Sequence, residues 1–290
     1  MKPLQNAMKH SEGQLKAYQG INLYYQCWLT DHDPEAIVAV VHGLAEHSGR
    51  YNNLVNFCLS KGYGIYIYDQ RGHGKSDGRR CYVEKFSYLI KDLDFFIDYI
   101  HIMHPGSKIF LLGHSMGGTV ATSYAILHQD KINGLILSGA LLRLPSGIPA
   151  GIIPFAHILS SIFPGMGLYV LQAEAISQDE KVVNAYVTDP LVYRGKICAR
   201  TGIELTRHLK MLEQRLPELD LPLLAMHGTA DRLADPSGSQ MLFQQARSKD
   251  KTLKLYEGLY HEIFNEPDRE KIFSDLDDWL KKHLESIKPN

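Results

Sequence analysis

The stretch that decides the fold is residues 113–118, Gly113-His114-Ser115-Met116-Gly117-Gly118, which has the form G-x-S-x-G. Before it, residues 108–112 (KIFLL) are apolar and partly β-branched, which predicts a buried strand. After it, residues 119–129 are mostly small or apolar, which predicts a helix. A strand, a sharp turn carrying a serine and a helix are the setting of a nucleophile elbow, which exposes the serine hydroxyl. The alternative is a glycine-rich turn whose serine only caps the helix.

Apolar strand patterns alternate with amphipathic helix patterns along most of the chain. A hairpin over residues 14–29 comes first. The predicted strands are then residues 36–41, 64–68, 108–112, 132–138, 221–227 and 252–256, and the predicted helices are residues 51–61, 85–104, 119–129, 241–249 and 269–287. This alternation predicts an α/β fold, with a mostly parallel sheet and helices on both faces. Ligand chemistry in such sheets lies at the carboxyl ends of the strands.

The alternation stops after residue 138. Residues 144–173 contain no Asp, Glu, Lys or Arg. A membrane span is one interpretation, but Pro149, Pro154 and Pro164 argue against an uninterrupted helix. A mobile apolar cap over an active site, able to contact lipid, fits better, and a buried helical insertion is the alternative. We therefore predict a core domain of residues 1–140 and 207–290, with an apolar cap of residues 141–206.

The composition narrows the class of partner. The formal net charge is −1 and no long basic run is present, so nucleic acid is not an expected partner. The four cysteines lie far apart without a C-x-x-C pair, which signals neither a zinc site nor a redox motif. Residues 1–6 have no apolar core of the kind found in a signal peptide. We expect a cytoplasmic protein with its thiols reduced.

A serine nucleophile needs a base, and histidine suits that role at neutral pH. His261 follows the last predicted strand, as the chain order serine, acid, histidine requires. His114 is expected to point away from the adjacent Ser115 and to act in packing or as a hydrogen-bond anchor. His42 and His227 end interior strands, and we expect them to brace loops.

The acid of such a set holds the imidazole in one tautomer. Asp231 follows the strand at residues 221–227 and is the preferred candidate. Asp235 is the rival, but it precedes Pro236 and is typical of a helix N-cap.

The reaction also needs two backbone donors for the oxyanion. The N–H of Met116, directly after the candidate nucleophile, is one. The N–H of Leu44, in the loop after residues 36–41, is the predicted second, with Gly43 letting the chain turn back. The alternative is a simple tight turn at His42-Gly43.

Residues 69–76 end in Gly-Lys-Ser, like a phosphate-binding loop. A Walker A sequence needs a glycine where this chain has Asp69, so the pattern fails. We predict a structural turn in which Asp69 and Arg71 fix neighbouring loops by charge-assisted hydrogen bonds.

Together these segments resemble the α/β-hydrolase superfamily, and more narrowly its monoacylglycerol lipase and lysophospholipase-like serine hydrolases. The matching segments are residues 42–51 (HGLAEHSGRY), 69–76 (DQRGHGKS), 113–118 and 228–231 (GTAD), with the loop that carries His261. The resemblance implies an α/β-hydrolase fold with a helical cap. It implies hydrolysis of a fatty acyl ester of glycerol, without a metal or organic cofactor.

The resemblance also assigns roles to the cap and the first loop. The cap forms an apolar tunnel for the acyl chain, and we expect peripheral membrane contact through it. Glu46 and Arg50 are predicted at the polar end of the substrate, or as a salt bridge that braces the loop. Mammalian-type members carry a second histidine three residues after the catalytic one, where this chain has Phe264.

Other functions remain open at this stage. A short-chain carboxylesterase or a lysophospholipase is the nearest alternative. An epoxide hydrolase or dehalogenase is disfavoured because those enzymes carry a carboxylate at the elbow. A non-catalytic receptor with this fold is the alternative from another class.

Overall fold

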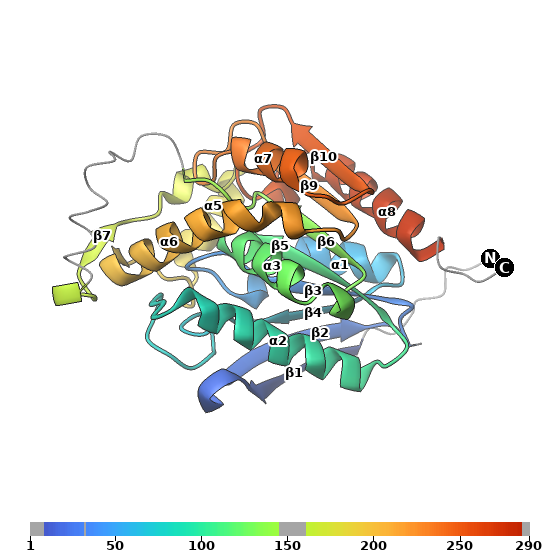
Figure 1. Ribbon diagram of the computed structural model, residues 1–290, viewed down its shortest axis with the longest axis horizontal. Coiled ribbons are helices and arrows are strands. Elements are labelled where there is room, and N and C mark those ends of the chain that lie inside the picture. The colour runs from blue at the N-terminus through green and yellow to red at the C-terminus, as the bar shows by residue number, and fades with distance from the viewer. Residues whose placement is uncertain (1–8, 32, 145–160, 286–290) are drawn as a thin grey trace.

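The computed structural model describes residues 9–31, 33–144 and 161–285. Its centre is a sheet of eight strands in the order β1-β2-β4-β3-β5-β6-β9-β10 (Figure 1). The strands are β1 (Lys9–Lys16), β2 (Asn22–Leu29), β3 (Ala36–Val41), β4 (Gly64–Tyr68), β5 (Lys108–His114), β6 (Gly134–Ser138), β9 (Leu223–Gly228) and β10 (Lys251–Tyr256). From β4 to β10 every neighbouring pair is parallel, whereas β1 and β2 are antiparallel. The predicted fold class is confirmed.

Interior strands follow the continuous apolar runs of the sequence. All residues of β3, β4, β6 and β9 are buried, because helices cover the sheet on both faces. The opening hairpin begins at Lys9, five residues before its predicted start. The first residues of β1 are exposed, so this edge strand carries no apolar alternation that would have marked it.

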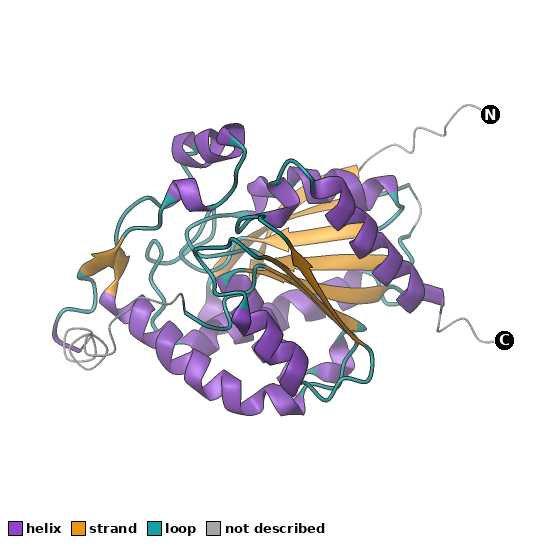
Figure 2. Ribbon diagram, turned by 90° about the horizontal axis from the view of Figure 1, so that it is seen from above, coloured by secondary structure: helices purple, strands orange, loops and turns teal. Residues whose placement is uncertain are grey.

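The helices form a layer on each face of the sheet (Figures 1 and 2). They are α1 (Asn52–Ser60), α2 (Phe86–Met103), α3 (Met116–Leu127), α5 (Glu180–Thr188), α6 (Ala199–Arg215), α7 (Ser237–Gln245) and α8 (Arg269–Glu285). One apolar core contains side chains of α2, α3, α6 and α7, and the other contains those of α1 and α8. The sheet therefore has a buried layer on either side, as the alternation predicts.

Helices α3 and α7 both begin earlier than the sequence predicts. Helix α3 begins at Met116 rather than at residue 119, because tight packing at Gly117 and Gly118 outweighs the low helix propensity of glycine. Helix α7 begins at Ser237, four residues before its predicted start.

The segment between β6 and β9 holds α5, α6 and a short ribbon of β7 (Gly167–Tyr169) with β8 (Ile197–Cys198). The apolar stretch that suggested a cap or a span lies partly outside the described residues, at positions 145–160. Among the residues that are described, no helix is long and apolar enough to cross a membrane. Helix α6 crosses the predicted boundary at residue 206, and its C-terminal half joins the core through Leu209 and Leu212.

Candidate active site

Ser115 lies at the sharp turn between β5 and α3. Its φ of 54° and ψ of −124° are strained for a residue with a side chain. A Cβ atom at Gly117 would lie 2.1 Å from the carbonyl oxygen of Val41 at the end of β3. Only glycine allows α3 to approach the sheet this closely, which holds the half-buried Ser115 at the carboxyl edge of β5. The turn has the geometry of the predicted nucleophile elbow.

His261 and Asp231 meet at the same edge of the sheet. Asp231 follows β9 and His261 follows β10, and His261 Nδ1 lies 2.7 Å from Asp231 Oδ2. A carboxylate only accepts hydrogen bonds, so Nδ1 carries the hydrogen and Nε2 keeps its lone pair. The His261 ring lies 4.7 Å from the ring of His114, the residue before Ser115. The structure thus brings Asp231 and His261 to the elbow.

Asp231 and His261 each shift the pKa of the other toward the charged form. Burial disfavours the charged imidazole of His261, but Asp231, together with Glu262 and Glu46, outweighs this effect and raises the pKa of His261 above its ordinary value. Burial alone would raise the pKa of Asp231, whereas His261 and His227 lower it well below its usual range. Asp231 is therefore a fixed anion beside a histidine whose basicity is increased.

Backbone groups fix the other oxygen of Asp231. Its Oδ1 accepts from the N–H groups of Leu233, at 2.8 Å, and Ala234, at 3.0 Å. Asp235, the rival acid, instead accepts from the N–H of Ser237 at the start of α7. It holds the helix start, as predicted, although Pro236 rather than Asp235 precedes the first helical residue.

His114 turns away from Ser115. Its Nδ1 donates to the carbonyl oxygen of Ser138, 2.9 Å away. Burial, and then the neighbouring His261, lower the pKa of His114, which keeps it neutral. This arrangement matches the expectation of a hydrogen-bond anchor.

The N–H groups of Leu44 and Met116 are the predicted oxyanion donors. Within the described part of the chain, neither has a hydrogen-bond partner. The loop after β3, which carries Leu44, turns at a different residue from the one predicted. Ala45, with a φ of 70°, makes the left-handed turn, and Gly43 serves by its small size, since a Cβ there would lie 3.0 Å from Ser115 Cβ.

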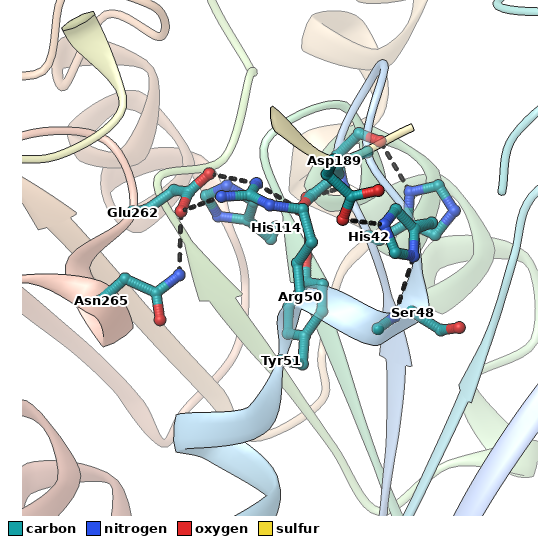
Figure 3. A network of polar contacts seen from close by, with 12 residues as sticks. His42, Ser48, Arg50, Tyr51, His114, Asp189, Glu262 and Asn265 are labelled. Atoms are coloured by element: carbon teal, nitrogen blue, oxygen red, sulfur yellow. Dashed lines mark hydrogen bonds and ion pairs between the residues drawn. The ribbon is translucent and has the colours of Figure 1, made fainter. Parts of the chain in front are cut away.

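Glu46 and Arg50 form a buried network behind this loop, and Figure 3 shows Arg50 bonded to Glu262 within it. Glu46 Oε1 accepts from the N–H of Gly43, at 2.6 Å, and from the hydroxyl of Tyr51, at 2.8 Å. Arg50 donates to Glu46 Oε2 at 3.1 Å and to both carboxylate oxygens of Glu262. These contacts support the loop-bracing alternative, and a role at the polar end of a substrate stays a prediction.

The same loop is fastened to the segment between β6 and β9. His47 Nε2 donates to Asp189 Oδ2 at 2.8 Å, and Arg50 lies 4.6 Å from the centre of the Tyr186 ring. Tyr193 donates its N–H to the carbonyl oxygen of Ala45 at 2.8 Å. The loop after β3 therefore contacts both the core domain and the region around α5.

The loop at residues 69–76 is the structural turn that its sequence predicts. Asp69 accepts from the N–H groups of Ser48 and Lys75, both at 2.7 Å. Arg71 donates to Asp92, on helix α2, at 2.8 Å.

Phe264 occupies the position three residues after His261. It is buried and stacks on Phe273 of α8, so its aromatic ring packs in the core.

Sequence reasoning missed two residues of the site. Glu262, directly after His261, pairs with Arg50, and its acidic side chain beside a candidate base was the only signal. Gly139, with a φ of 51°, packs so closely that a Cβ there would lie 2.8 Å from the carbonyl oxygen of His261. No motif marks this glycine in the sequence.

Comparisons with known proteins find similar sequences and structures. The family model described as "Serine aminopeptidase, S33" matches residues 32–268. The monoacylglycerol lipase of Mycolicibacterium smegmatis is 35% identical over 94% of this chain and 98% of its own length. The human monoglyceride lipase is 33% identical over 91% of this chain and 88% of its own.

A solved structure is similar over nearly the whole length. The Paleococcus ferrophilus monoacylglycerol lipase superposes with a TM-score of 0.79 at 31% identity. The match covers 96% of this chain and 99% of that one.

Proposed function

The chain belongs to the serine hydrolase family described as serine aminopeptidase S33, and we propose that it hydrolyses monoacylglycerols to fatty acid and glycerol. The observation that carries the proposal is the bond from His261 Nδ1 to Asp231 beside the strained elbow of Ser115. The names of the relatives supply the substrate class, because these proteins are called monoacylglycerol or monoglyceride lipases. Each match covers most of this chain and most of the relative.

The reaction follows from the tautomer of His261. Nε2 accepts the hydroxyl proton of Ser115 while Ser115 Oγ attacks the ester carbonyl carbon. The N–H groups of Leu44 and Met116 stabilise the oxyanion that forms. His261 then gives the proton to the glycerol oxygen as the carbon–oxygen bond breaks, which leaves an acyl group on Ser115.

Water completes the cycle by the same route. His261 takes a proton from water, whose oxygen attacks the acyl carbonyl, and returns it to Ser115 as the fatty acid leaves. Asp231 stays ionised throughout and stabilises the charged imidazole. This scheme requires no cofactor.

We further propose that residues 141–206 cap this site and that the cap contacts membranes. Its exposed apolar side chains support the idea. They are Ile162, Phe163, Met166, Leu168, Tyr169 and Val170, each at least 44% exposed. An exposed apolar group of this kind is suited to a lipid surface.

Co-sedimentation with phosphatidylcholine vesicles tests the membrane contact. Phe163→Asp should reduce the bound fraction, whereas Ile102→Asp on the distant surface of α2, where Ile102 is 76% exposed, should not. Equal binding by both variants and the parent chain would exclude the cap as the contact.

A substrate panel tests the main proposal. Monoacylglycerols of increasing chain length are compared with the matching lysophospholipids, p-nitrophenyl esters and an aminoacyl anilide. The proposal predicts the highest kcat/KM on a monoacylglycerol. Activity confined to short activated esters would favour the carboxylesterase alternative, and cleavage of the anilide alone would favour a peptidase.

A further inference from the structure

His227 is a second histidine on the proposed catalytic acid. It is the next-to-last residue of strand β9, is fully buried, and places Nε2 3.0 Å from Asp231 Oδ2. The same Nε2 lies 3.2 Å from the carbonyl oxygen of Ala234. On the other side of the ring, Nδ1 lies 2.8 Å from Ser239 Oγ on helix α7.

The partners of His227 assign its hydrogens. Asp231 Oδ2 and the carbonyl oxygen of Ala234 are both acceptors, so Nε2 must carry a hydrogen. In the neutral ring, Nδ1 then accepts from the hydroxyl of Ser239. His227 therefore directs a donor at the same carboxylate oxygen that holds His261.

Within the part of the chain that the structure describes, four donors to the Asp231 side chain divide evenly between its two oxygens. Oδ1 is held by two backbone N–H groups, and Oδ2 by His261 and His227. Of the two donors to Oδ2, His261 is the one that gains and loses a proton during the proposed reaction. Among the described residues, His227 is then the one donor left to hold Oδ2 in place while the hydrogen bond from His261 changes in strength.

We propose that His227 is a positioning residue that fixes Oδ2 of Asp231 in line with His261 Nδ1. This inference rests on the proposed function. Without His227, Oδ2 of Asp231 loses one of its two donors, so the carboxylate is held less firmly against small rotations about its Cβ–Cγ bond. The imidazole of His261 then loses part of the alignment that keeps Nε2 free for Ser115. Ser239 acts one step further away by holding the ring of His227.

A purely structural role makes a different prediction. His227 also contacts Ala234 and Ser239, so it joins β9 to the start of α7. If that were its whole contribution, loss of the ring would lower stability and leave turnover by the remaining folded protein unchanged.

The test measures kcat, KM and melting temperature for His227→Leu, His227→Gln and Ser239→Ala. The glutamine amide reaches the position of Nε2 and keeps a donor for Asp231. The matched control is His104→Leu, since His104 is another buried histidine, bonded to Tyr66 and to none of the proposed site residues.

We expect His227→Leu to lower kcat by about 10- to 100-fold with KM unchanged, the size of effect that follows loss of a group orienting a metal ligand through a comparable second hydrogen bond. His227→Gln should restore most of kcat, and Ser239→Ala should lose less than His227→Leu. His104→Leu should lower the melting temperature and leave kcat unchanged. If His227→Leu does not fold, His227→Gln and Ser239→Ala carry the test.

Two results would overturn the inference. One is a His227→Leu enzyme, or in its absence a Ser239→Ala enzyme, with the parent kcat. The other is a His227→Gln enzyme with no recovery of kcat despite the parent melting temperature. Ser115→Ala is assayed alongside, because an active Ser115→Ala enzyme would contradict the proposed function itself.

Discussion

Arg50 and Glu262 form a buried, bidentate ion pair between two loops that lie far apart in the sequence. Arg50 Nη1 is 2.6 Å from Glu262 Oε1, and Nη2 is 3.0 Å from Oε2. Glu262 follows His261 directly, while Arg50 also holds Glu46, which in turn accepts from the N–H of Gly43. The pair therefore ties the loop after β3, which carries the proposed oxyanion donor Leu44, to the loop of the proposed base.

Removal of Arg50 should destabilise the fold strongly. Arg50→Ala leaves two buried carboxylates without their shared cation, which should lower the free energy of unfolding by about 3–5 kcal/mol. Urea denaturation followed by circular dichroism measures this change.

An exposed ion pair provides the control. Lys282 is paired with Asp250 at 2.7 Å but is 61% exposed, so Lys282→Ala should cost less than about 1 kcal/mol. Equal losses in the two variants would contradict the role assigned to Arg50.

The raised pKa of His261 predicts a pH dependence. The base works only when the imidazole is neutral, and Asp231 favours its charged form after offsetting the effect of burial. As the pH is lowered, kcat/KM should therefore decrease with a midpoint above about pH 6.5, the ordinary pKa of histidine. A pH profile measured with a substrate that does not titrate gives this midpoint. A midpoint below that value would contradict the arrangement.

The choice of acid can be tested with matched variants. Asp231→Asn should lower kcat by about 10⁴-fold, because the amide no longer holds the reactive tautomer. Asp235→Asn should keep the parent kcat, since Asp235 bonds the start of α7 and not His261. Steady-state kinetics on one monoacylglycerol decides between them, and the reverse result would make Asp235 the acid.

Gly139 should be sensitive for two separable reasons. Its φ of 51° strains any side chain, and a Cβ would also lie 3.2 Å from His261 Nδ1. Gly62 has a φ of 80° and open space around it, so Gly62→Ala reports the backbone strain alone. Gly139→Ala should lower both stability and kcat, whereas Gly62→Ala should lower stability by about 1–2 kcal/mol with kcat unchanged. A Gly139→Ala enzyme with the parent kcat would show that the close contact is unimportant.

Much of the fold is predictable from local patterns. The parallel strands are continuous apolar runs, so β3, β4 and β6 could be placed closely from the sequence. The exposed strand β1 has no such pattern, and helix α3 begins at glycines that propensity disfavours. In both elements, tertiary pairing and packing override the local signal.

Some residues of the candidate site can likewise be predicted from the sequence, and others depend on contacts across the fold. Ser115, Asp231 and His261 each follow a strand in a set chain order, so a sequence rule finds them. Glu262, Gly139 and the contacts of His227 depend on which loops meet at the sheet edge. Distances across the fold decide those contacts, and no spacing in the sequence carries them.

The most direct test of the central claim is fatty acid release from a long-chain monoacylglycerol by the parent chain and by Ser115→Ala, with folding checked by circular dichroism. The account predicts rapid turnover by the parent and a loss of about 10⁶-fold in the variant, because the nucleophile is gone. A folded Ser115→Ala protein that still turns over the substrate at the parent rate would contradict it.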